Sequence, residues 1–217
     1  MPEKGGILIK SVLNILFFVF WIVIVKLLII EWREKLHDLK ALNVPIVTDH
    51  GETEAEIVRG LSTERYEHSV LFDKEGRKLL ELTSQAYRFV HYHCPQFEEV
   101  EDQIYLRLHN HPRTDTAFSD SDLGSLSCAR YIKVITPAHV YTLENPRFDD
   151  GFRPDYRKLI FYYDMIQITP IGLLLTLYDG LVMTYHSRGQ CKLQIYCCNK
   201  VAKKFGLNFT IEPLSAY

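Results

Sequence analysis

The chain has 217 residues, which is more than one typical domain but too few for two full ones, so we expect one main globular domain plus a short extra segment. Hydrophobic residues at 47% and charged residues at 24% exclude a disordered, collagen-like or disulfide-scaffold protein. Removing residues 1–30, with their three lysines and one glutamate, leaves 22 basic and 26 acidic residues, a net charge of -4. Nucleic acid is therefore not expected as a partner. The five cysteines lack CxxC spacing and fit a reducing compartment.

Residues 7–30 form a nearly uninterrupted apolar run in which only Lys10 and Lys26 are charged. As a helix, these 24 residues would rise about 36 Å, which is enough to cross a hydrocarbon layer of about 30 Å. No signal-peptide cleavage site follows the run, so we expect the segment to remain attached. The sequence predicts a single transmembrane helix at 7–30, and a buried core helix is the alternative reading.

Basic residues around this run set the expected topology. Two lie at its N-terminal side, and four lie at or after its C-terminal end (Lys26, Arg33, Lys35 and Lys40). Because cytoplasmic flanks carry the excess of Lys and Arg, we expect a single-pass protein of the cell membrane with its C-terminal domain in the cytoplasm.

After the apolar run, residues 31–51 are expected to form a juxtamembrane helix and linker, with a break at 43–45, and residues 52–217 the domain. Periodicity predicts a helix at 52–61 and a strand at 67–72 followed by a turn at 73–76. Further strands are expected at 86–93, 104–108, 131–136 and 139–143.

The C-terminal part reads as more strand, followed by one helix. Residues 158–165 and 173–186 are rich in β-formers, and Asp179-Gly180 is a good hairpin turn. A helix at 199–205 and a strand at 207–213 close the chain. The expected fold class is therefore α+β, with a mixed sheet flanked by helices and preceded by the membrane helix.

The chemistry is concentrated at 108–123, LHNHPRTDTAFSDSDL. On a strand, His109 and His111 point to the same face, and Asp122 falls in the first turn of a helix that begins after Ser119. Two imidazoles, one carboxylate and an open fourth position are typical of a catalytic zinc site. In isolation, an HxH pair is usually an ordinary surface or core pair and SxxD a capping box. In one register, HxHP-x6-SxxD should arise by chance in roughly one chain in ten thousand or fewer.

At these residues the sequence resembles the JAB/MPN (JAMM) metalloprotease superfamily, whose hallmark is an upstream Glu, then HxHP, a spacer and SxxD. The resemblance implies a cytidine-deaminase-like fold, Zn²⁺ held by His109, His111 and Asp122, and Ser119 as a donor to the oxyanion. Asn110 makes the string HNHP similar to the bacterial RadC branch. The resemblance covers roughly residues 52–146, with a motif core at 64–146, and residues 147–217 carry no recognised motif.

The family's catalytic Glu lies on an earlier strand, where it takes a proton from the zinc-bound water and delivers it to the leaving amine. Glu67 is the best candidate, because YEHSVLFDKEGRKL resembles the corresponding RadC strand and Glu67 precedes His109 by 42 residues. An ordinary edge-strand glutamate is the alternative, and Glu64 and Glu81 are the rival bases. His68 should point to the opposite face of the strand.

Two other stretches could suggest a site. His91 and His93 form a second HxH on an expected strand but lack a following SxxD, so a strand face is favoured over a second metal site. The basic stretch at 200–204 reads as a solvated helix face.

Together these features predict a membrane-anchored, zinc-dependent peptidase or isopeptidase of the JAMM type. Its substrate would be a protein or peptide tail, and the resemblance places ubiquitin-like proteins among the candidates. A catalytically weak RadC-like or MPN scaffold is the alternative, and the charge of -4 weakens a third reading as a nucleic-acid-associated protein.

Overall fold

The computed structural model describes residues 17, 18, 21, 22, 25, 26, 28, 29, 32, 33, 35–112, 115–185 and 191–217. The membrane helix predicted at 7–30 therefore lies largely outside the described residues. Those described within it are helical, and their large apolar side chains are exposed. Among the described residues, no single helix combines the length and apolar character needed to cross a membrane. One pair of helices meets the test of length and apolar character when taken together, but the two are bent by 76° relative to each other (Tyr156–Gln167 and Pro170–Asp179).

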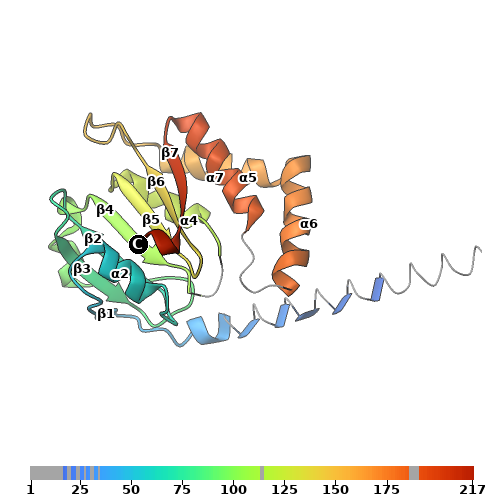
Figure 1. Ribbon diagram of the computed structural model, residues 1–217, viewed down its shortest axis with the longest axis horizontal. Helices are drawn as coiled ribbons and strands as arrows, with labels where there is room; N and C mark the ends of the chain where they lie inside the picture. The colour runs from blue at the N-terminus through green and yellow to red at the C-terminus, as the bar shows by residue number, and fades with distance from the viewer. Residues whose placement is uncertain are drawn as a thin grey trace, which may run out of the picture.

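The domain is built on a seven-stranded mixed sheet with helices on both faces (Figure 1). The sheet order is β1-β3-β2-β4-β5-β6-β7, and only the β4–β5 pair is parallel. The strands are β1 (Ile46–Val47), β2 (His68–Phe72), β3 (Lys78–Thr83), β4 (Leu106–Asn110), β5 (Tyr131–Ile135), β6 (His139–Glu144) and β7 (Asn208–Pro213). The helices are α2 (Glu54–Leu61), α3 (Pro95–Glu98), α4 (Asp120–Leu123), α5 (Tyr156–Gln167), α6 (Pro170–Tyr185) and α7 (Lys192–Phe205). Short 3-10 turns lie at Glu101–Gln103, Gly124–Ser127 and Leu214–Ala216. The expected α+β class is confirmed.

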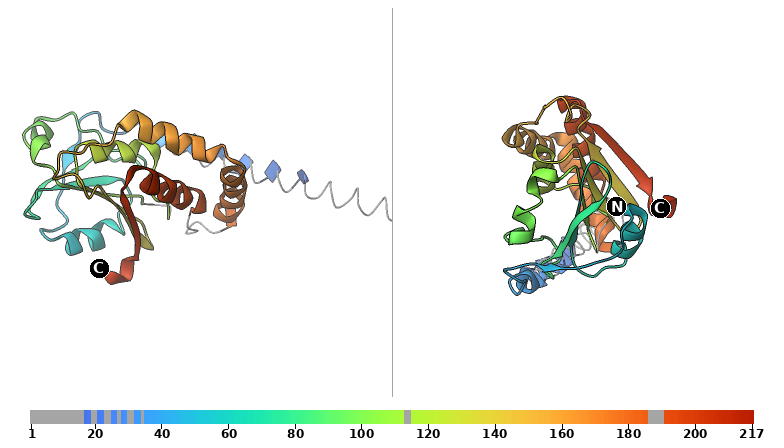
Figure 2. Two further views of the ribbon diagram at one scale, coloured as in Figure 1. Left: turned by 90° about the horizontal axis from the view of Figure 1, so that it is seen from above. Right: turned by 90° about the vertical axis from the view of Figure 1, so that its left-hand side faces the viewer.

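The two faces of the sheet carry separate hydrophobic clusters. Helix α2 covers one face, where Ile57, Val58 and Leu61 pack against strand residues such as Val70 and Leu108. Helices α4, α5 and α7 cover the other face, in a larger cluster (Figure 2). All five residues of β2 are buried, because both of its faces are covered.

The helix predicted at 52–61 is present as α2, which begins two residues later than expected. Thr53 and Glu56 form a capping box, in which each side chain binds the backbone N–H of the other, so the helix starts at Glu54. The strands predicted at 67–72, 131–136, 139–143 and 207–213 are also present, within one or two residues. The sheet starts earlier than the expected domain boundary at 52, since β1 pairs with β3.

The prediction of strands at 158–165 and 173–186 is wrong, because residues 158–165 and 173–185 are helical; residue 186 lies outside the described residues. In α5, Leu159, Tyr163 and Ile166 recur at helical spacing and are buried, while Phe161 is exposed. Uniformly apolar runs do not distinguish strand from helix by periodicity, and here the helix is the structure. Asp179 does not form a hairpin turn, because it lies within α6. Its carboxylate accepts hydrogen bonds from the Lys192 and Leu193 N–H groups at the start of α7.

The prediction of a strand at 86–93 is also wrong, and β3 lies just before it. The chain leaves the sheet after Thr83, where Gln85 adopts a positive φ of 56° that interrupts extended structure. Helix α7 is longer than expected and starts at Lys192, with Val201 and Ala202 buried while Lys200, Lys203 and Lys204 face solvent. The basic stretch is thus a solvated helix face.

Candidate metal centre

The end of β4 and the start of α4 bring His109, His111 and Asp122 together. His109 Nε2 lies 3.2 Å from Asp122 Oδ1, and His111 Nε2 lies 3.7 Å from Asp122 Oδ2. Each of the three residues offers a ligand atom, and these atoms all lie within 4.8 Å of one another. The structure therefore groups the three ligands predicted from the sequence in a geometry that could hold a metal ion.

Asp122 is positioned by the turn that starts α4. Ser119 caps the helix, and its backbone N–H and its hydroxyl each donate to Asp122 Oδ2 at 2.7 Å. The SxxD pair is thus the capping box that its spacing suggests, and the same box turns the carboxylate towards both imidazoles. Ser119 and Asp122 therefore form a helix cap and at the same time orient a possible metal ligand.

The histidine ring nitrogens differ in their partners. His111 Nδ1 contacts the carbonyl and the hydroxyl oxygens of Thr116 at 3.0 and 2.9 Å, which leaves Nε2 to face Asp122. Both ring nitrogens of His109 are buried without a hydrogen-bond partner among the described residues. Buried polar atoms are normally satisfied, so an ion beside His109 Nε2 would account for one that is not.

Burial shapes the protonation of these ligands. Burial lowers the pKa of His111 to about 4, so its imidazole is neutral at pH 7 with a lone pair available. Burial alone would raise the pKa of Asp122, but the imidazole of His109 holds it well below its ordinary value. Neutral imidazoles and an ionised carboxylate are the forms that bind a cation.

Glu67 shares a pocket of about 360 Å³ with His111 and Asp122. The pocket is lined by Glu67, Tyr87, Arg88, His111, Pro112, Thr116, Ser119, Ser121, Asp122 and Gln194. Ser69 pairs with His109 across β2 and β4, so continuing the antiparallel register by two residues sets Glu67 opposite His111 on the same face. Burial, followed by the charge of Asp122, raises the pKa of Glu67 well above its ordinary value.

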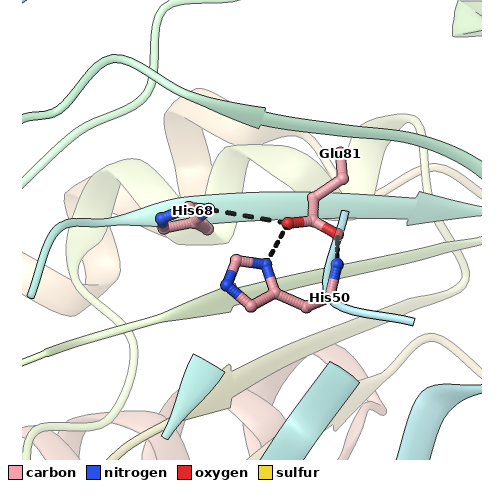
Figure 3. Close-up of side chains that lie close together, drawn as sticks. All are labelled: His50, His68 and Glu81. Carbon is pink, nitrogen blue, oxygen red and sulfur yellow. Dashed lines mark hydrogen bonds and ion pairs between the residues drawn. The ribbon is translucent and has the colours of Figure 1, made fainter. Parts of the chain in front are cut away.

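The rival glutamates lie elsewhere. Glu81 pairs with Val70 across β3 and β2, which places its side chain on the face opposite His109. There it contacts His50 and His68 (Figure 3), and Glu64 contacts the same two imidazoles. Burial would raise the pKa of Glu81, but hydrogen bonds from His68 and His50 hold it at about 2. The orientation of His68 is as expected from the alternation of the strand.

Arg107 was not recognised in the sequence. It precedes His109 by two residues on β4, is half-buried on the same face, and donates to Ser125 Oγ and the Tyr92 hydroxyl. Its charge acts on both Asp122 and Glu67. The period-2 spacing of Arg107, His109 and His111 was the available signal.

A second buried network fixes the loop between β4 and α4. Asp115 accepts hydrogen bonds from the hydroxyls of Thr136 at 2.6 Å and Tyr141 at 2.9 Å, and it pairs with His139 Nδ1 at 2.8 Å. His139, which carries no motif, therefore supports the loop that places Thr116 beside His111.

The rival pair His91 and His93 does not lie on a strand, so the argument for a shared face does not apply. Among the described residues, the groups that could hold a metal are His109, His111 and Asp122, and separately His50, His68 and Glu81. Neither group includes the rival pair.

In comparisons with family models, curated proteins and solved structures, nothing matches the chain. The metal-binding geometry stands on the contacts described above. The JAB/MPN resemblance stands on the motif.

Asn110 links the site to the preceding loop. Its side-chain oxygen accepts from the His68 N–H at 2.7 Å, and its amide nitrogen donates to the carbonyls of Leu61 at 3.2 Å and Tyr66 at 3.1 Å. The fully buried Asn110 side chain thus replaces a backbone hydrogen bond between β2 and β4, next to Glu67.

We predict that Asn110→Ala lowers the free energy of unfolding by about 1–3 kcal/mol, because it leaves buried backbone groups unpaired. Denaturant titration of the purified protein measures the change. Asn199→Ala is the matched control: its side chain is exposed and donates to Ile195 O, so a change within about 0.5 kcal/mol is expected. Equal losses for the two variants would contradict this role of Asn110.

Proposed function

We propose that the protein is a zinc-dependent peptidase or isopeptidase of the JAB/MPN type that hydrolyses an amide bond in a protein or peptide. One observation carries the proposal: four of the five residues singled out from the motif and the upstream strand line one pocket, and the fifth, His109, lies beside Asp122. His109, His111 and Asp122 supply a metal-binding group, and Glu67 and Ser119 line the pocket with His111 and Asp122.

The donor set fits zinc. Two imidazole nitrogens and one carboxylate leave a fourth position open, as in catalytic zinc sites, and His109 Nε2 is buried without a hydrogen bond. Zinc, when bound, would acidify a water molecule and polarise the scissile carbonyl. His109, His111 and Asp122 would hold it.

Glu67 would move the proton. Its carboxylate is buried in the pocket, and burial and the charge of Asp122 raise its pKa, which makes it a stronger proton acceptor than an exposed glutamate. It would take the proton of the water and then deliver it to the leaving amine. Its backbone is held on both sides, by its N–H to Ala86 O and by its carbonyl accepting from Thr83 Oγ1, each at 2.8 Å. A base held in this way needs little reorganisation during the reaction.

Ser119 would stabilise developing charge on the carbonyl oxygen. Its hydroxyl donates to Asp122 and lies 2.8 Å from Ser121 Oγ. Rotation about one side-chain bond would turn the hydroxyl to the substrate, while the Ser119 backbone N–H continues to hold Asp122. The residue thus has a positioning role through its backbone and a catalytic role through its hydroxyl.

We further propose that residues 7–30 anchor the protein in the cell membrane, with the pocket close to the bilayer. Two features of the described residues support this. Asp38, which follows the predicted span, accepts hydrogen bonds from Tyr87 N and Arg88 Nε, each at 2.9 Å, and Tyr87 and Arg88 line the pocket. Helix α6 also exposes Ile171, Leu173, Leu174, Leu177 and Tyr178. Such a site would favour flexible, membrane-proximal protein tails, with ubiquitin-like proteins among the candidates.

Glu67→Gln tests the enzyme proposal. The amide keeps the size of the side chain but cannot accept the proton, so turnover should fall by about 10²–10⁴-fold while zinc content and folding stay unchanged. Cleavage is followed by mass spectrometry on ubiquitin-like fusions and co-expressed membrane-proximal candidates. Glu98→Gln, at an exposed glutamate outside the pocket, is the control and should be fully active.

Full activity of Glu67→Gln would remove Glu67 from the mechanism, and because Glu64 and Glu81 do not line the pocket, it would contradict the general-base mechanism proposed here. If zinc-loaded wild type cleaves nothing across the panel, while it and the Gln variant both capture the same partners, the chain is a scaffold rather than a peptidase.

The topology is tested by reporters fused after Tyr217 in a bacterial host. We predict a fluorescent reporter that matures in the cytoplasm to be bright and a phosphatase that requires export to be silent, because basic residues flank the C-terminal end of the span. The full chain should resist carbonate extraction, and the same chain without residues 1–30 should not. Recovery of the intact chain in the soluble fraction would favour a core helix over a membrane span.

A further inference from the structure

A second group of metal-ligating side chains lies on the sheet face opposite the pocket. His50 follows β1, His68 begins β2, and Glu81 lies in the middle of β3, so three separate segments converge (Figure 3). Each offers a ligand atom, and these atoms all lie within 4.8 Å of one another. None of the three lines the pocket that holds Glu67.

The ring nitrogens are arranged between two carboxylates. On one side, the Nδ1 atoms of both histidines face Glu81 Oε1: His50 Nδ1 forms a close contact, and His68 Nδ1 lies at 3.6 Å. On the other side, the Nε2 atoms of both histidines face Glu64, at 2.9 Å for His50 and 3.7 Å for His68. Four nitrogens therefore each approach a carboxylate oxygen.

This arrangement exceeds what two neutral imidazoles can satisfy. A neutral imidazole carries one N–H and one lone pair, so two rings donate to only two of the four carboxylate approaches. For His50, whose two ring nitrogens both lie close to carboxylate oxygens, the remaining lone pair would then point at a carboxylate. His68 Nδ1 also lies 3.2 Å from Thr48 Oγ1. Burial would lower the pKa of His50, but its hydrogen bonds to Glu81 and Glu64 raise it, and a protonated His50 would donate to both carboxylates. A cation beside the Nδ1 atoms would also remove the conflict, and it would balance a Glu81 carboxylate that is almost completely buried.

We propose that His50, His68 and Glu81 form a second, structural site for a divalent transition metal of the zinc class. The Nδ1 atoms of the two histidines and the Glu81 carboxylate would be the ligands. Glu64 would accept hydrogen bonds from both Nε2–H groups, and this orients the rings as outer carboxylates do at metal-bound histidines. Imidazole with carboxylate suits zinc better than the all-oxygen sets preferred by calcium and magnesium.

The surroundings fit a site with a structural role. Thr48 Oγ1 donates to Glu81 Oε1 at 2.7 Å, and the His50 N–H donates to Glu81 Oε2 at 3.0 Å, so the carboxylate is already oriented. Gly60 of α2 makes room for His50, since a Cβ there would lie 3.1 Å from the ring carbon Cδ2. A metal here would join the two-residue strand β1 and its following loop to β2 and β3.

The test uses the full chain purified in detergent, reconstituted with zinc, dialysed against metal-free buffer and analysed by inductively coupled plasma mass spectrometry. The double variant His109→Ala, Asp122→Ala removes the first centre, so its outcome does not depend on the proposed peptidase. We expect this variant to retain one zinc per chain and to lose it when His50→Gln and His68→Gln are added. His139→Gln, which alters an imidazole paired with Asp115, should leave that zinc in place.

Thermal unfolding guards against a simple folding defect. Zinc should raise the melting temperature of the double variant, and adding Glu81→Gln, which preserves side-chain size, should abolish the rise. A double variant that holds no zinc would overturn the proposal. Zinc that survives the loss of both His50 and His68 would also overturn it.

Discussion

The site depends on the antiparallel pairing of β2 with β4. Because side chains alternate along a strand, the pairing of Ser69 with His109 puts Arg107, His109 and His111 on the same face as Glu67. If β4 slipped by one residue relative to β2, Arg107, His109 and His111 would move to the opposite face of the sheet from Glu67. Asn110 secures the register at this point, since its buried side chain binds the His68 N–H where the ladder ends.

The same alternation gives β2 two chemical faces. Glu67 lines the pocket and Ser69 lies on the same face, while His68, between them, faces the cluster with His50 and Glu81. Both faces are buried, so each charged group needs a partner: Glu67 lies near Arg107, and Glu81 is held by Thr48 and the two histidines. If both centres bind metal, ions on opposite faces would hold the start of β2, and with it the position of Glu67.

The parts of this structure that are local in the sequence were predictable. The ligand spacing of His109 and His111, the cap formed by Ser119, and the start of α2 depend on contacts within a few residues, and each lies within two residues of where its pattern indicates. Strand β5 was also found, since β-branched and aromatic residues dominate its sequence YIKVI.

Other features depend on distant contacts. Helices α5 and α6 are apolar enough to read as strands, and only their packing and the use of Asp179 as a cap for α7 decide the matter. Strand β3 carries Lys78 and Glu81, which weaken a strand pattern, but Glu81 is accommodated by histidines from two other segments. Choosing between Glu67, Glu64 and Glu81 required the register of three strands.

The central claim is that His109, His111 and Asp122 hold a zinc ion beside Glu67. Anomalous diffraction at the zinc edge, from crystals of the zinc-loaded full chain, tests it directly. The account predicts an anomalous peak within about 2.0–2.2 Å of the His109 and His111 Nε2 atoms and an Asp122 carboxylate oxygen, next to the Glu67 carboxylate. Crystals with the same fold and no anomalous peak at these three residues would contradict it.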